Sequence, residues 1–91
     1  MIYVDELRDR GWRFGPNCHM ATDDLSEAGL HALHLLALAI GLHRSDFQPK
    51  SFPHYDLTGK LRQRAIECGA VTVTGREMVL MIRQARKQVT A

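Results

Sequence analysis

The stretch TDDLSEAGLHALHLLALAIGL, residues 22–42, decides the fold, because it has the features of a complete helix. Acidic residues in its first turn suit the positive end of a helix dipole, and Gly41 follows the last apolar residue, as is common where helices end. The pattern predicts a helix over residues 24–40. Since apolar residues occupy most of its circumference, we expect a central, buried helix in which Gly29 marks a close contact or a weak point.

Two short runs of strand-forming residues flank this helix in the sequence. MIYV, residues 1–4, ends at Asp5 and is predicted to be a buried strand, and AVTVT, residues 70–74, is predicted to be a second. WRF, residues 12–14, alternates in polarity and is a candidate for a short edge strand. The segment HRSDFQPKSFPHY, residues 43–55, lacks periodicity and contains two prolines, so it is predicted to be an ordered loop.

Two further helices are predicted in the second half of the chain. One covers residues 57–68, with Asp56 as its N-cap and Gly69 as its stop. TGRE, residues 74–77, has the spacing of a capping box and starts a last helix that runs to Gln88.

The elements follow one another in the order strand, helix, helix, strand, helix. This order predicts a small α/β domain over residues 1–91, with two to three short strands, mostly a parallel pair, packed against three helices. A chain of 91 residues is too short for two independently stable domains. Ligands of such sheets gather beyond the carboxyl ends of the strands, here beside Asp5 and beside residues 75–76.

The composition, 45% hydrophobic and 24% charged, is that of an ordinary globular protein. Cys18 and Cys68 are too few for a disulfide framework, and the acidic N-terminus does not resemble a secretory signal, so we expect a cytoplasmic protein with reduced thiols. The longest apolar run falls far short of the roughly 20 residues that span a bilayer, which predicts no membrane role. A core this small leaves room for stabilisation by a homodimer contact.

The charge is unevenly distributed along the chain. Residues 1–59 carry five Lys and Arg against eight Asp and Glu, whereas residues 60–91 carry seven against two. The basic C-terminal third would attract phosphates, although a basic helix is also simply a solvated face.

Five histidines are candidates for chemistry. His31 and His34 are three residues apart on the central helix, a spacing that can hold one metal ion or merely reflect packing. Cys18 precedes His19, which raises a thiol nucleophile as one interpretation and a polar site at His19 as another. The remaining two are His43 and His54.

The segment FPHYDL, residues 52–57, carries the most specific polar cluster. Asp56 is explained by helix capping alone, but capping requires neither the imidazole of His54 nor the phenol of Tyr55. Together the three side chains offer a titratable group, a donor and a carboxylate at a helix N-terminus suited to an anion.

The segments MIYVD, CHM, LHLLALAIGL, FQ, PHYDL and GAVTV followed by GRE together resemble the family known as domain of unknown function 4031, small proteins of bacteria and phages. The resemblance extends nearly from end to end and implies a shared fold rather than a particular reaction. His31 lies outside its motif blocks. The matched positions are Asp5, Cys18, His19, His34, Phe47, Gln48, His54, Tyr55 and Asp56.

The first functional hypothesis is a binding module whose polar pocket takes a phosphate-bearing ligand, either a nucleotide or nucleic acid. His19, His54 and Asp56 are the candidate catalytic residues if the pocket also carries out a reaction. The expected ligand-binding residues are Asp5, His34, Tyr55, Arg62 and Arg76, with Lys60 as another cation at the rim.

A second hypothesis is a metal-dependent enzyme. His19, His34 and His54, with Asp5 or Asp56, would hold a divalent metal that activates water for phosphoester hydrolysis. The third hypothesis is a structural or protein-binding domain whose histidines are satisfied polar groups.

Overall fold

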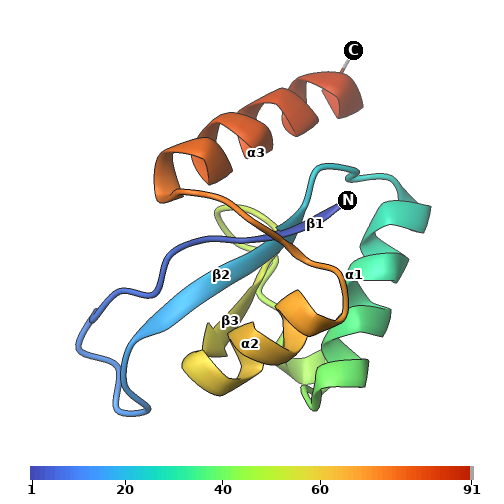
Figure 1. The fold of residues 1–91 in the computed structure, drawn as a ribbon. Coiled ribbons are helices and arrows are strands. Elements are labelled where there is room, and N and C mark those ends of the chain that lie inside the picture. The colour runs from blue at the N-terminus through green and yellow to red at the C-terminus, as the bar shows by residue number, and fades with distance from the viewer. Residues whose placement is uncertain (91) are drawn as a thin grey trace.

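The computed structural model describes residues 1–90, which form a small α/β domain with one four-stranded sheet (Figure 1). The strands are β1 (Ile2–Val4), β2 (Asn17–Thr22), β3 (Tyr55–Thr58) and β4 (Val71–Thr72), and their order across the sheet is β3-β2-β1-β4. β1 pairs with β4 in parallel and with β2 antiparallel, and β2 pairs antiparallel with β3. The sheet is therefore mixed.

The predicted parallel pair is confirmed as β1 and β4, but the predicted number of strands is wrong. Both missed strands mix polar and apolar residues, so neither reads as an apolar run, and their pairing with each other stabilises them. WRF, residues 12–14, lies in a turn rather than an edge strand. Asp56 lies within β3 and does not cap a helix, a role that falls to Thr58, whose hydroxyl accepts a hydrogen bond from the Leu61 N–H at 3.4 Å.

The three predicted helices are confirmed, with shifted starts. α1 spans Glu27–Ile40, α2 spans Gly59–Glu67 and α3 spans Gly75–Thr90, and a short 3-10 helix, η1, covers Arg44–Asp46. Among residues 1–90, no helix is both long and apolar enough to cross a membrane.

The predicted helix ends have clear causes. Ser26, not an acidic residue, is the N-cap of α1, and its hydroxyl accepts from the Gly29 N–H at 3.2 Å. Gly41 ends α1 in the left-handed conformation with φ 108°. The capping box before α3 is present, because the Glu77 N–H donates to the Thr74 hydroxyl at 3.1 Å and the Thr74 N–H donates to the Glu77 carboxylate at 2.9 Å.

The sheet separates a large core from a small one. α1 and α2 cover one face and α3 lies over the other (Figure 1). Successive side chains of a strand point to opposite faces, so β2 sends Cys18 and Met20 into the large core and Ala21 toward α3. The small core consists of Ala21, Met78 and Ile82 with four partly buried neighbours, namely Tyr3, Phe52, Val73 and Met81.

α1 is a covering helix and not a fully buried one, which corrects the expectation from its composition. Its buried residues are Gly29, Leu33, Ala37 and Ile40, which form one stripe. Leu35 and Leu38 remain about half exposed. The apolar surface of α1 is therefore wider than the stripe that packs against the rest of the domain.

Replacing Gly29 with Ala should destabilise the fold. A Cβ at this position would lie 2.0 Å from the backbone carbonyl oxygen of Asp24, so the chain entering α1 would have to move. We expect a loss of about 1–3 kcal/mol in the free energy of unfolding, measured by urea denaturation. Gly59→Ala is the matched control, because its Cβ would meet only Leu7 at 3.6 Å in the first turn of α2. If both variants unfold at the wild-type urea concentration, the close approach at Gly29 is not a constraint.

Candidate functional site

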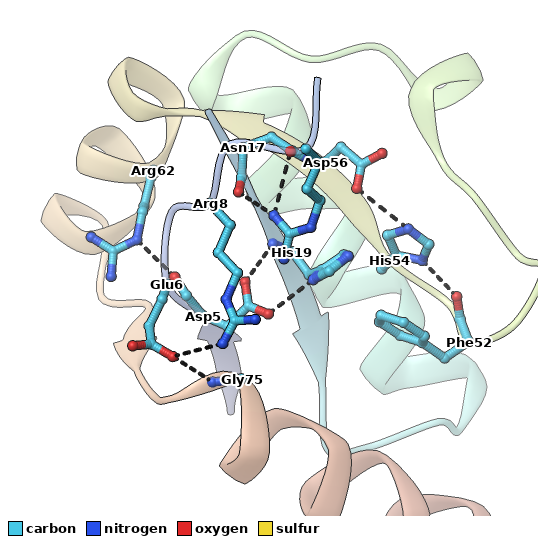
Figure 2. Close-up of polar contacts among 11 residues, drawn as sticks. Asp5, Glu6, Arg8, Asn17, His19, Phe52, His54, Asp56, Arg62 and Gly75 are labelled. Carbon is cyan, nitrogen blue, oxygen red and sulfur yellow. Dashed lines mark hydrogen bonds and ion pairs between the residues drawn. The ribbon is translucent and has the colours of Figure 1, made fainter. Parts of the chain in front are cut away.

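The chemistry-bearing side chains gather on the α3 face of the sheet. His19 in β2 pairs directly with Asp56 in β3, so both project from the same face. His54 lies two residues before Asp56 and shares that face, whereas Tyr55 and Leu57 project into the large core. Figure 2 shows His19, His54 and Asp56 as neighbours, with Asp5 beside His19.

Asp5 holds His19 in place. Its side chain is buried, and its two carboxylate oxygens accept from the His19 backbone N–H at 2.6 Å and from His19 Nδ1 at 2.9 Å. Burial raises the pKa of the Asp5 carboxyl, but the hydrogen bonds from His19 outweigh it and leave the pKa below its ordinary value. Because an ionised carboxylate only accepts, Nδ1 of His19 carries a proton, and in the neutral imidazole Nε2 keeps a lone pair.

His54 is held in the same tautomer by a different acceptor. Its Nδ1 lies 2.8 Å from the carbonyl oxygen of Phe52, which can only accept, so Nδ1 donates, and in the neutral imidazole Nε2 carries the lone pair. The Phe52 ring stacks on His54, with ring centroids 4.3 Å apart. The rings of His54 and His19 meet edge to face at 5.3 Å. Both imidazoles are therefore fixed in orientation.

Three of these residues form a group that can hold a metal ion. His19, His54 and Asp56 each offer one ligand atom, and the three atoms lie within 4.8 Å of one another. His54 Nε2 is 3.5 Å from Asp56 Oδ1. The Gln48 amide donates to Asp56 Oδ2 and orients this carboxylate. The side chains of His19 and Asp56 are 24% and 26% exposed, so the group is accessible to a small ligand.

A cavity of about 590 Å³ adjoins this group. It lies between α3 and residues 5–10, the segment after β1. His19 and Phe52 line it, as does Asp5. Its apolar wall includes Met78 and Ile82 of α3. Five arginines complete the lining, namely Arg8, Arg10, Arg76, Arg83 and Arg86.

The segment after β1 also anchors the start of α3. The Glu6 carboxylate accepts from the Gly75 N–H at 3.0 Å and lies 3.9 Å from Arg8 (Figure 2). Arg10 donates to the backbone carbonyl of Asn17 in β2. The cavity is thus bordered by segments that are tied to the sheet.

The expected convergence of three imidazoles is met by His19 and His54 only. His34 lies on α1, across the sheet, where its Nδ1 is hydrogen-bonded to the Tyr55 hydroxyl at 2.8 Å and its ring meets Phe47 edge to face. The period of two along β3 places Tyr55 opposite His54 and Asp56, which divides the predicted triplet. His34 and Tyr55 therefore connect α1 to β3 and do not line the cavity.

The remaining predicted residues also separate. Arg76 lines the cavity. Arg62 is not among the lining residues, but its Nε donates to the backbone carbonyl of Asp5 at 2.9 Å and so connects α2 to the residue that holds His19. Lys60 is not among the lining residues. Burial raises the pKa of the Cys18 thiol to about 12, and its side chain lies in the large core, so it is unsuited to be a nucleophile.

Sequence reasoning missed the arginines other than Arg76. Arg8 and Arg10 lie outside every predicted element, and Arg83 and Arg86 are predicted only as part of the basic C-terminal third. One signal was present, since Arg76, Arg83 and Arg86 are spaced seven and three residues apart and thus fall on one side of a helix.

Comparison with known proteins identifies the family. Residues 2–85 match the family model described as protein of unknown function (DUF4031), so the chain belongs to this family, and the resemblance noted in the sequence is confirmed. No protein with a curated description and no solved structure gives a significant match.

Lowering the pH should remove the stability that neutral His34 provides. Burial, followed by the charge of Arg44, lowers the pKa of His34 in the folded protein, so below about 6.5 the unfolded chain binds a proton that the folded chain resists. The contribution of neutral His34 to the free energy of unfolding is complete above that pH and is lost as the pH falls. The free energy of unfolding should therefore fall more in the wild type than in His34→Gln between about pH 7.5 and about pH 5.5.

Urea denaturation at the two pH values measures this difference. His31→Gln removes an exposed imidazole from the same helix, and since the charge of His31 is the smallest of the three causes that lower the His34 pKa, this variant should keep most of the wild-type fall. An equal fall in His34→Gln would show that His34 does not carry the effect.

Proposed function

We propose that this chain binds a phosphate-bearing ligand, a nucleotide in preference to a nucleic-acid strand, in the cavity between α3 and the segment after β1. The observation that carries the proposal is the set of five arginines around one cavity of about 590 Å³. Guanidinium groups bind phosphate oxygens through paired N–H donors, and several of them around one space favour a ligand with more than one anionic group.

The electrostatics of the lining favour an anion. Asp5 is the acidic residue of this lining within the described part of the chain, and both of its oxygens are occupied by His19. Among the side chains of residues 1–88, neither Arg76 nor Arg83 has a hydrogen bond or ion pair. These two exposed cations on α3 are available to a ligand.

The apolar wall supports an organic ligand rather than free phosphate. Phe52 and the half-exposed Val79 offer a surface for a flat ring beside the arginines. A volume of about 590 Å³ lies within the range of roughly 300–1,000 Å³ typical of small-molecule sites. A nucleotide combines a flat ring with phosphates on this scale, whereas a polynucleotide strand would have to extend beyond the cavity.

Metal-dependent phosphoester hydrolysis is a second candidate, favoured by the position of His19 in both the cavity lining and the His19, His54 and Asp56 group. A phosphate held by the arginines would lie near any metal in that group. His19, His54 and Asp56 would hold the ion, which would lower the pKa of water and so supply the nucleophile for attack on phosphorus, with departure of the protonated ester oxygen.

Removing two cavity arginines should weaken nucleotide binding. Isothermal titration with nucleoside mono-, di- and triphosphates should show at least a tenfold loss of affinity in Arg76→Ala/Arg83→Ala, since charge-assisted hydrogen bonds contribute about 1.5–3 kcal/mol each. Arg13→Ala/Lys60→Ala loses the same charge outside the cavity and should bind as the wild type does. Affinity should also fall as salt rises from about 50 to about 200 mM.

The outcomes separate the ligand classes. Tighter binding of a single-stranded oligonucleotide than of any mononucleotide would replace the nucleotide with a nucleic acid. Equal weakening in the two double variants, binding that ignores salt, or no binding of any probe would overturn the proposal.

A further inference from the structure

We infer that His19, His54 and Asp56 form a binding site for one divalent transition-metal ion of the Zn²⁺ type, with ligand atoms His19 Nε2, His54 Nε2 and Asp56 Oδ1. Its catalytic role rests on the second candidate function, phosphoester hydrolysis, but metal binding itself requires no substrate. Four observations support the site.

The first observation is the rigid placement of the ligands. His19 and Asp56 are directly opposed residues of the antiparallel pair β2 and β3, and His54 is fixed by the isolated bridge that its backbone forms with Gln48. Ligands carried on paired strands keep their separation better than ligands on free loops. The group therefore exists before any ion arrives.

The second observation is that both imidazoles present the same nitrogen. A carboxylate holds Nδ1–H of His19 and a carbonyl oxygen holds Nδ1–H of His54. These are the two acceptors that most often orient metal-binding histidines, because they fix the tautomer and leave Nε2 as the ligand. Asp5 and Phe52 thus act as positioning residues around the ion.

The third observation is the spacing. The 3.5 Å between His54 Nε2 and Asp56 Oδ1 is close to the roughly 3.3 Å that separates neighbouring ligands at tetrahedral zinc. The widest separation in the group is within 4.8 Å, so a small rotation of the half-buried Asp56 side chain toward the two fixed imidazoles would close the set. Gln48 occupies the other oxygen of Asp56, which leaves Oδ1 for the ion.

The fourth observation is the chemical identity of the ligands. Two imidazoles and one carboxylate suit Zn²⁺, Co²⁺ or Ni²⁺, whereas Mg²⁺ and Ca²⁺ prefer oxygen ligands. Three protein ligands leave at least one position for water or a phosphate oxygen, which distinguishes this site from a closed structural one. Because His19 also lines the arginine cavity, that position belongs to the same region as the proposed ligand.

Metal titration of the tag-free, chelator-treated protein tests the site. Isothermal titration with Zn²⁺ should give one ion per chain, Co²⁺ should give the visible absorption of a bound ion, and Mg²⁺ should not compete. His54→Gln and Asp56→Asn should each lower Zn²⁺ affinity at least tenfold. His31→Gln is the matched control, since it removes an exposed imidazole outside the group and should bind as the wild type does.

Asp5→Asn tests whether the Asp5 carboxylate positions His19 for metal binding. Loss of the carboxylate should weaken Zn²⁺ binding about 10–100-fold without removing a ligand. Circular dichroism and urea denaturation establish which variants remain folded, and Asp56→Asn keeps the test decisive if His54→Gln does not fold. Wild-type affinity in both ligand variants, or no Zn²⁺ binding by the wild type, would overturn the site.

The two proposals fail separately. If Zn²⁺ binds but bis(p-nitrophenyl) phosphate is not hydrolysed, the metal site stands and hydrolysis is excluded for that ester. If Zn²⁺ does not bind but nucleotides do, the arginine cavity stands without a metal. Hydrolysis that persists in Asp56→Asn would contradict the role of this site in the reaction.

Discussion

The hydrogen bonds between the buried Asp5 carboxylate and His19 are the constraint on which the rest of the site depends. Asp5 follows β1, and its two oxygens bind the backbone and the imidazole of one residue of β2. A buried carboxylate without partners would be costly, so this residue pair has little freedom. Arg62 adds a hydrogen bond from α2 to the Asp5 carbonyl. The same interaction thus holds the strand end and fixes which nitrogen His19 presents.

The two faces of the sheet are packed differently, and only the face covered by α3 borders the arginine cavity. The α1 and α2 face carries the large core, and its polar pair, His34 and Tyr55, is satisfied internally. On the α3 face, the small core has three buried members among the described residues, Ala21, Met78 and Ile82. A helix held by so few apolar contacts leaves space beside the sheet, and that space is lined by arginines from α3 and from the segment after β1.

The proposed metal site and the arginine cavity complement each other chemically. Arginines neutralise a phosphate and orient it, while a metal ion lowers the pKa of bound water and stabilises charge on the oxygens of phosphorus. His19 is the residue common to both. Its orientation by Asp5 therefore bears on both the proposed metal site and the proposed ligand site.

Sequence alone determined the three helices, their capping by Gly41 and by the Thr74 and Glu77 pair, and the parallel strands, because apolar period and cap chemistry are local properties. It also identified His19, His54 and Asp56 as candidate site residues, although helix capping alone would have explained Asp56. Only the tertiary structure decided that β2 and β3 pair with each other, since neither segment has the apolar pattern that predicts a strand from sequence. That pairing then decided the site, because alternation along a strand sends His54 and Asp56 to one face and Tyr55 to the other.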